Sequence, residues 1–228
     1  MRIFLDKIGS WTICYSFSMR YLMKYKFLIG IDEAGRGPLA GPVAVGAFAA
    51  RSEMAAKLLK MFKGARDSKK MTPAARERVF LEIKKAQKAG HIYFAVSYSS
   101  VKMIDEKGIV PAIKFALNRS LKKIETNFIQ GLPLDKCQVL LDGSLKAPSR
   151  YLNQKTIIGG DDKEPVISLA SICAKVLRDR KMISLARKHQ HHGFDVHKGY
   201  GTKAHYKAIK KYGLTKEHRR SFLKGIAS

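Results

Sequence analysis

Apolar residues fall along this chain in two kinds of pattern, which together predict the order of its strands and helices. A short run such as Phe27–Ile31 is apolar throughout, and residues 91–99 place Ile92, Phe94 and Val96 at every second position. Both patterns are typical of strands, whereas longer segments repeat apolar residues at helical spacing. We predict strands over residues 27–32, 42–50, 91–99, 137–141 and 156–158. We predict helices over residues 54–63, 72–88, 113–124, 165–189, 202–212 and 215–225. This alternation indicates an α/β domain, with a central mixed β-sheet flanked by helices and a small helical C-terminal lobe.

Local signals mark several element ends. Thr72 offers a side chain that caps a helix, Pro73 suits the first helical position, and Gly90 ends the same helix. The glycine-rich and proline-rich turn over residues 35–42 joins the first two strands, so we expect these strands to pair as neighbours.

Four acidic residues stand where predicted strands end in glycine-containing loops, namely Asp32, Glu33, Asp142 and Asp161. Ligand sites of α/β sheets favour such strand ends. Converging carboxylates repel one another, and their pKa values rise unless a cation neutralises them. A lysine or arginine suffices for any single acid. For the set of four, two Mg²⁺ or Mn²⁺ ions fit better if the substrate is a phosphodiester, because these ions prefer oxygen ligands and together activate water and stabilise the leaving oxygen.

One pair of these acids poses a geometric problem. Asp32 and Glu33 are adjacent, and neighbouring residues on a strand point to opposite faces of the sheet. Both side chains therefore reach one metal only if the strand bends or ends there, and otherwise Glu33 contributes its main-chain carbonyl.

The charge of the chain narrows the class of partner. The 228 residues include 44 Lys and Arg against 18 Asp and Glu, a formal net charge of +26, and the basic residues are spread along most of the chain. This distribution predicts nucleic acid rather than a membrane surface as the partner. No run approaches the roughly 18 apolar residues of a membrane span. The three cysteines form no CxxC pair, which predicts a cytoplasmic protein without disulfides or a zinc site.

Three further segments have residue types that suit contact with a nucleic acid. Glycines at 35 and 37 allow close approach of backbone N–H groups, hydroxyl and ammonium groups at 68 and 69 suit phosphate, and a tyrosine between glycines at 200 suits stacking. Each segment also has a plain structural interpretation, as a hairpin turn, a solvated loop and a helix-capping turn. The histidines at 189, 191 and 192 are interpreted as basic loop residues. We predict substrate contacts at Gly35, Arg36, Gly37, Ser68, Lys69 and Tyr200.

Together, these residues make the chain resemble ribonuclease HII, the type 2 ribonuclease H, in order from about residue 24 to residue 224. The matching motifs are GIDEAGRGP at 30–38, DSKK at 67–70, LDG at 141–143, GD at 160–161, ISLASICAKVLRD at 167–179, HKGYGT at 197–202 and HRRSF at 218–222.

The resemblance implies a ribonuclease H-like fold and hydrolysis of RNA in RNA/DNA hybrids and at single ribonucleotides embedded in duplex DNA. It implies cleavage on the 5′ side of the ribonucleotide, leaving 3′-hydroxyl and 5′-phosphate ends, with two divalent ions held by the four acids. By motif position, Gly35, Arg36 and Gly37 match the family's ribose-sensing turn. Tyr200 matches the tyrosine that stacks at the RNA–DNA junction.

Other interpretations remain open at this point. The sister type, ribonuclease HIII, usually has a large N-terminal binding domain and a glutamate as the fourth acid, whereas this chain has Asp161 and about 23 extra residues. A non-catalytic basic RNA-binding protein fits the charge but has no use for four clustered acids. Another nuclease of the same fold would lack the Gly-Arg-Gly turn and Tyr200. We expect a monomer, with residues 1–23 as a poorly ordered extension or an over-called start and residues 24–228 as the catalytic domain.

Overall fold

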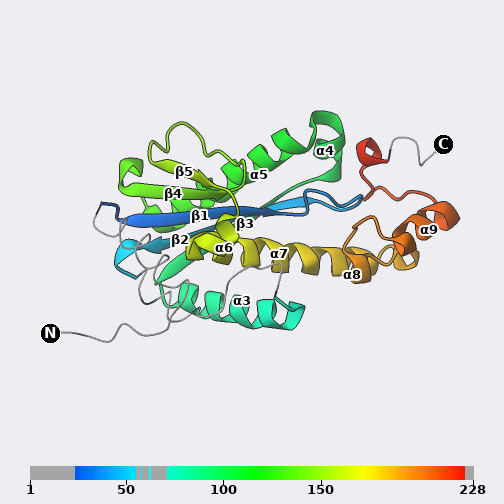
Figure 1. Ribbon diagram of the computed structural model, residues 1–228, viewed down its shortest axis with the longest axis horizontal. Coiled ribbons are helices and arrows are strands. Elements are labelled where there is room, and N and C mark those ends of the chain that lie inside the picture. Colours follow the sequence, from blue (N-terminus) through cyan, green and yellow to red (C-terminus); the bar gives the residue numbers. More distant parts are fainter. Residues whose placement is uncertain (1–23, 55–56, 58–61, 63–70, 224–228) are drawn as a thin grey trace.

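A five-stranded mixed sheet forms the centre of the protein (Figure 1). The structure is a computed structural model that describes residues 24–54, 57, 62 and 71–223. The strands are β1 (Phe27–Ala34), β2 (Val43–Arg51), β3 (Ile92–Ser99), β4 (Cys137–Asp142) and β5 (Gln154–Ile157). Their order is β3-β2-β1-β4-β5, in which β2 is antiparallel to its two neighbours and β1, β4 and β5 are parallel. The mixed sheet and the pairing of the first two strands were both predicted from the sequence.

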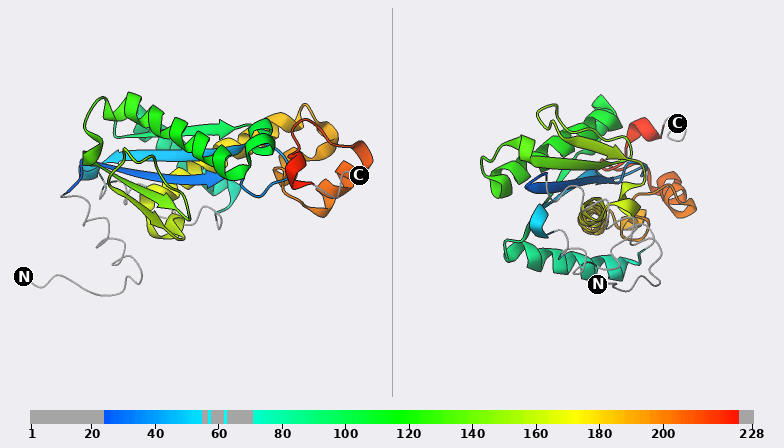
Figure 2. Two further views of the ribbon diagram at one scale, coloured as in Figure 1. Left: turned by 90° about the horizontal axis from the view of Figure 1, so that it is seen from above. Right: turned by 60° about the vertical axis from the view of Figure 1, so that its left-hand side comes forward.

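Helices cover both faces of this sheet. The α-helices of the described residues are α3 (Pro73–Lys88), α4 (Val101–Lys107), α5 (Ile109–Ile124), α6 (Gly160–Lys163), α7 (Pro165–Ala186), α8 (Phe194–His197) and α9 (Lys203–Tyr212), of which α8 and α9 lie beyond the sheet (Figure 1). Figure 2 shows α7 between the sheet and α3, whereas α4 and α5 lie on the opposite face. Helix α7 is buried on most sides, because it packs against both the sheet and α3.

The alternation of β1 sends its side chains into the two layers. Phe27, Ile29 and Ile31 belong to the core beneath α5, whereas Leu28 packs into the core that contains α7. By the same period of two, Asp32 points toward α7 and Glu33 toward the side of α5.

The C-terminal lobe lies beyond the end of α7, on the right of Figure 1. Phe194 is fully buried at its centre, with the rings of His192, His197, His205 and His218 between 5.5 and 6.1 Å from its ring centroid. Of the three histidines interpreted as basic loop residues, His192 is therefore part of this packing, whereas His191 is exposed.

The predicted helix over residues 215–225 is wrong for the described residues, which end at 223. Only one 3₁₀ turn forms there, Arg220–Phe222. In a helix the Arg219 N–H would donate to the Thr215 carbonyl, but it donates to the Leu39 carbonyl at 2.7 Å, and Ala40 forms a β-bridge with His218. Tertiary hydrogen bonds thus replace the helical ones.

Other local predictions are confirmed. The Thr72 side chain accepts a hydrogen bond from the Ala75 N–H at 3.2 Å, with Pro73 in the first helical position. Helices α4, α6 and α8 were not predicted. The predicted helix over residues 54–63 and the extension over residues 1–23 lie largely or wholly outside the described residues. No helix in the described part of the chain is both long and apolar enough to cross a membrane.

Candidate active site

The parallel strands bring the four predicted acids to one edge of the sheet. Asp32 and Glu33 lie near the end of β1, Asp142 is the last residue of β4, and Asp161 is in the first turn of α6, shortly after β5. Because β1, β4 and β5 are parallel and adjacent, their carboxyl ends meet at the same edge.

Asp32 is the more deeply placed of the two acids on β1. Its side chain is 3% exposed, and its Oδ1 accepts a hydrogen bond from the Glu33 N–H at 2.7 Å. The pKa of the Asp32 carboxyl is raised from 3.8 to about 8, mainly by burial; a hydrogen bond to Ser171 of α7 opposes the rise, and the charges of Asp142 and Glu33 add to it. A cation at this position would therefore remove a large electrostatic cost.

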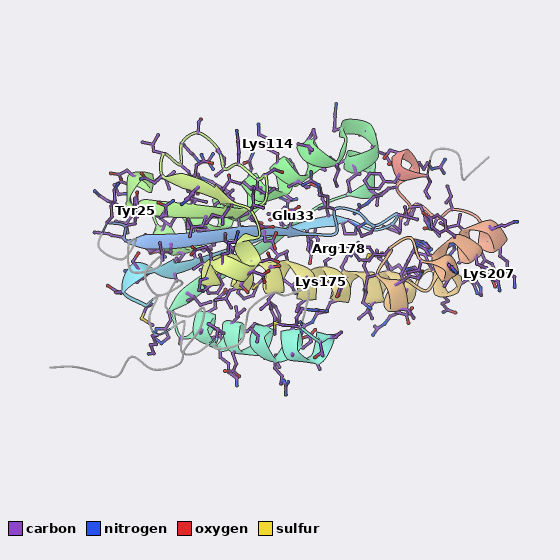
Figure 3. The ribbon with its side chains drawn as sticks, viewed as in Figure 1. Tyr25, Glu33, Lys114, Lys175, Arg178 and Lys207 are labelled. Atoms are coloured by element: carbon purple, nitrogen blue, oxygen red, sulfur yellow. The ribbon has the colours of Figure 1, made fainter. Side chains whose placement is uncertain are left out.

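Glu33 lies beside Arg36, which reaches its Oε1 at 3.5 Å. Burial raises the pKa of Glu33, Arg36 lowers it, and the charge of Asp142 raises it again. Asp142 therefore influences the carboxyl groups of both Asp32 and Glu33, although the two leave the strand on opposite faces. Figure 3 shows Glu33 in the middle of the molecule, between Lys114 on one side and Lys175 and Arg178 of α7 on the other.

The other two acids are linked through the start of α6. Asp142 Oδ1 accepts a hydrogen bond from the Gly160 N–H at 2.7 Å, and Asp161, the next residue, is 3% exposed. This bond joins the end of β4 to the loop after β5, so Asp161 is held beside Asp142.

These carboxylates fit a site for divalent ions by the chemistry of their donor atoms. Within the described residues, no group of three or more His, Cys, Asp or Glu side chains lies close enough together to hold a metal ion by itself. Mg²⁺ rarely uses an all-protein cage; it binds through one or two carboxylates and takes its other ligands from water and substrate phosphates. Carboxylate oxygens that are buried at Asp32 and Asp161 and half-buried at Glu33 and Asp142 match that mode of binding.

The turn after β1 contains two glycines whose surroundings differ: a side chain at Gly35 would clash with the protein, whereas Gly37 faces open space. Gly35 has a φ of +88°, and a Cβ there would lie 1.8 Å from Nε of Arg178, so the fold itself excludes a side chain. A Cβ on Gly37 would meet no described atom within 4 Å. The open side of Gly37, next to the exposed Arg36, therefore gives a ligand access to the backbone.

Tyr200 presents its ring at the surface, 42% exposed, although its backbone is held in a turn before α9. The Lys175 ammonium lies 5.6 Å and the Arg178 guanidinium 5.9 Å from the ring centroid. Arg178 also reaches the turn at Gly35. One side chain of α7 therefore places Tyr200 near that turn.

Helix α7 also sets the spacing between Tyr200 and the acids. Ser171, which forms a hydrogen bond with Asp32, precedes Arg178 by seven residues of this helix. Seven residues span about two helical turns, or roughly 10 Å along the axis. Tyr200 thus lies about two turns of α7 away from the point where the helix contacts the acids.

A basic groove of about 480 Å³ begins at Arg36 and runs between α5 and the loop over residues 144–149, which follows Asp142. Lys114 and Lys146 are exposed on its walls, and none of the described residues that line it is acidic. The groove therefore continues the site with positive charge. The predicted contacts Ser68 and Lys69 lie outside the described residues.

The sequence prediction assigned no separate role to Arg178 and Arg219, which are both fully buried. Arg178 donates to the carbonyls of Pro42, Ala40 and Lys198 at 3.0–3.3 Å. The sequence signal that could have revealed these arginines is their position inside the motifs at 167–179 and 218–222, but a charged residue in such a motif gives no sign that it is buried.

Comparisons with known proteins identify the family and the fold of this chain. A model of the ribonuclease HII family matches residues 29–224. Ribonuclease HII of Caldicellulosiruptor bescii is 44% identical over 204 residues, 90% of this chain and 90% of that protein. The crystal structure of ribonuclease H2 from Pyrococcus horikoshii OT3 matches with a TM-score of 0.65 at 24% identity, covering 88% of this chain and 97% of that chain. Bst ribonuclease HIII in complex with Mn²⁺ matches with a TM-score of 0.62 at 18% identity, over 97% of this chain and 70% of that chain.

The two solved structures confirm the predicted ribonuclease H-like fold. The family is established by the model match over residues 29–224 and by the 44% sequence identity to ribonuclease HII of Caldicellulosiruptor bescii over 90% of both proteins. The chain therefore belongs to the ribonuclease HII family, whose members are metal-dependent ribonucleases.

Proposed function

We propose that this protein hydrolyses RNA in RNA/DNA hybrids and at single ribonucleotides embedded in duplex DNA, cutting on the 5′ side of the ribonucleotide to leave 3′-hydroxyl and 5′-phosphate ends. The observation that carries the proposal is the meeting of Asp32, Glu33 and Asp142 at one sheet edge, beside an open glycine turn and an exposed Tyr200. A single strand of nucleic acid can contact all three features.

Asp32, Glu33, Asp142 and Asp161 would hold two divalent ions, Mg²⁺ or Mn²⁺. When bound, such ions supply an activated water and stabilise charge on the leaving oxygen. The chain's own contribution is to gather and bury the carboxylates: the Glu33 N–H orients Asp32, and the Gly160 N–H orients Asp142. Fixed hydrogen bonds of this kind keep ligand oxygens in place without reorganisation.

Ribonucleotide selection would come from the turn and the ring. The 2′-hydroxyl both donates and accepts hydrogen bonds, and it is the group that distinguishes RNA from DNA at one site. Gly37 leaves the backbone open to it, and Tyr200 offers an apolar face to the neighbouring sugar. Lys114 and Lys146 in the basic groove would contact phosphates farther along the duplex.

The test is cleavage of a DNA duplex with one embedded ribonucleotide, with Mg²⁺, with Mn²⁺ and with EDTA, followed by mapping of the product ends. We expect metal-dependent cleavage 5′ of the ribonucleotide and no cleavage of an all-DNA duplex. A non-catalytic RNA-binding protein would bind in EDTA and cleave in none of these conditions. We further propose that the protein acts as a cytoplasmic monomer; sedimentation with and without the duplex would test the monomer.

A further inference from the structure

Two adjacent residues near the end of the described chain, His218 and Arg219, reach two different parts of the proposed ribonucleotide-binding surface. Their exposed fractions are 1% and 0%. They are held there by the β-bridge between Ala40 and His218 and by the hydrogen bond from the Gly41 N–H to the Glu217 carbonyl at 2.8 Å. Both side chains are therefore enclosed by the protein and act on the surface from beneath it.

The Arg219 guanidinium binds the backbone of the turn after β1. Its Nε donates to the Gly41 carbonyl at 2.9 Å, Nη1 to the Arg36 carbonyl at 2.9 Å and Nη2 to the Gly35 carbonyl at 2.7 Å. The C=O and N–H of one trans peptide point in opposite directions. Carbonyls of Gly35 and Arg36 that face Arg219 therefore direct the N–H groups of Arg36 and Gly37 away from it.

Burying this cation is costly, which argues against a purely stabilising role. Burial, followed by the nearby charge of Arg178, lowers the pKa of Arg219 to about 9. The guanidinium is satisfied by carbonyl oxygens of the turn, and its rigid fork of donors holds three carbonyls in one geometry. The flexible ammonium of a lysine lacks such a fork.

His218 reaches Tyr200 through one intermediate ring. Its Nδ1 accepts a hydrogen bond from the Thr215 N–H at 2.9 Å, so in the neutral ring the proton is on Nε2. That proton is donated to Nε2 of His205 at 3.0 Å, and His205 then has its own proton on Nδ1, which donates to the Tyr200 carbonyl at 2.9 Å. One pair of tautomers satisfies the whole chain of bonds.

The Arg219 branch, which is its contact with the turn, and the His218 branch, which is its contact with Tyr200 through His205, are also joined by a backbone hydrogen bond. The Leu39 N–H donates to the Gly199 carbonyl at 2.8 Å, and the residue after Gly199 is Tyr200. The turn and the tyrosine are thus parts of one network, and His218 and Arg219 fix it from the same side.

We propose that His218 and Arg219 are positioning residues for ribonucleotide recognition: Arg219 presents the N–H groups of the Gly35–Gly37 turn, and His218, through His205, sets the position of Tyr200. This inference rests on the proposed function of the turn and of Tyr200.

The Arg219 branch is tested by Arg219→Lys with Arg220→Lys as a matched control, because Arg220 is the exposed neighbour and undergoes the same chemical change. The measurement is the affinity for a duplex with one ribonucleotide divided by that for the same all-DNA duplex, in metal-free buffer. We expect Arg219→Lys to reduce this ratio roughly tenfold, the loss of about one charge-assisted hydrogen bond, with little change in all-DNA affinity. A purely structural role would lower both affinities together, and a ratio equal to that of Arg220→Lys would overturn the proposal.

The His218 branch is tested by His218→Phe and His218→Gln, with exposed His191→Phe as the control. The readout is the cleavage rate at a single embedded ribonucleotide relative to that within a long hybrid. We expect His218→Phe to reproduce most of the decrease caused by Tyr200→Ala, and to change the ratio by less than about twofold when Tyr200 is already alanine. His218→Gln, whose amide can still donate to His205, should recover part of the ratio and remains informative if the phenylalanine variant does not fold.

These experiments distinguish failure of the proposed function from failure of the positioning role. If the parent protein does not cleave the ribonucleotide-containing duplex, the proposed function fails. If the parent cleaves it and the effects of His218→Phe and Tyr200→Ala add independently, the proposed function stands and the positioning role is refuted.

Discussion

Replacing Asp32 with asparagine should stabilise the metal-free protein while abolishing cleavage. The Asp32 carboxyl is 3% exposed, and its pKa is raised to about 8, mainly by burial. Asparagine keeps an oxygen that can accept from the Glu33 N–H and removes the charge. The substitution therefore separates the electrostatic cost of the site from its packing.

The magnitude follows from linkage between protonation and folding. The unfolded carboxyl ionises near pH 3.8 and the folded one near 8, so the native state binds more protons between these values and stability falls as the pH rises through that window. Each pH unit contributes about 1.4 kcal/mol, which from 3.8 to 7 gives at most about 4 kcal/mol. Allowing for relaxation of the site, we expect Asp32→Asn to gain about 2–4 kcal/mol at pH 7, or roughly 4–16 °C in Tm for a chain of this size.

The assay is thermal unfolding in EDTA from pH 4 to pH 9, repeated with Mg²⁺. The difference between variant and parent should be near zero at pH 4, grow to about pH 8 and then level off. Mg²⁺ should raise the Tm of the parent more than that of the variant, because only the parent keeps the full set of carboxylates. Asp162→Asn, in an exposed acid next to Asp161, is the control and should change little. A difference that does not depend on pH, or a variant less stable than the parent at pH 8, would refute the reasoning.

Three further predictions concern substrate and pH. The double variant Lys114→Ala/Lys146→Ala should reduce the steepness of log affinity against log salt concentration by about 2, since each phosphate contact contributes about 0.9. The control is the double variant Lys84→Ala/Lys88→Ala, in exposed residues of α3 on the opposite face of the sheet, which should leave that slope unchanged. Tyr200→Ala should reduce cleavage at a single ribonucleotide relative to a long hybrid by roughly 5- to 150-fold, from about 1–3 kcal/mol of stacking, and an unchanged ratio would leave Tyr200 as a capping turn. Burial lowers the pKa values of His205 and His218 to about 4, below the unfolded value of about 6.5. The contribution of the two neutral rings to the free energy of unfolding is therefore present above pH 6.5 and is lost as the pH falls toward 4. The difference in free energy of unfolding between the parent and His218→Gln, measured by urea unfolding, should shrink over that range.

The parts of this molecule that depend on local pattern could be predicted from the sequence. Apolar runs located the strands, and Thr72 with Pro73 located the start of α3, because capping depends on residues a few positions apart. The convergence of Asp32 and Asp142 was also predictable, since parallel strands that end in acids bring them to one edge.

The rest depends on contacts between distant residues. Residues 215–225 have helical periodicity, but bonds that join Arg219 and Glu217 to the turn at 39–41 outweigh it. The position of Glu33 beside Arg36, and the common influence of Asp142 on Asp32 and Glu33, depend on how the turn after β1 and the neighbouring strand β4 lie against β1. Burial of Arg178 and Arg219 could not be inferred from a sequence in which most Lys and Arg are solvated.

The bonds of Arg219 also impose an order on biosynthesis. Residues 35–41 leave the ribosome early, yet the donors that hold their carbonyls are 178 to 184 positions farther along the chain. Domains generally fold as units during translation, so this turn gains its bonding partners only when the last part of the domain has been synthesised. The geometry of this turn, and with it the ribonucleotide selectivity proposed above, would therefore arise only after residue 219 has emerged.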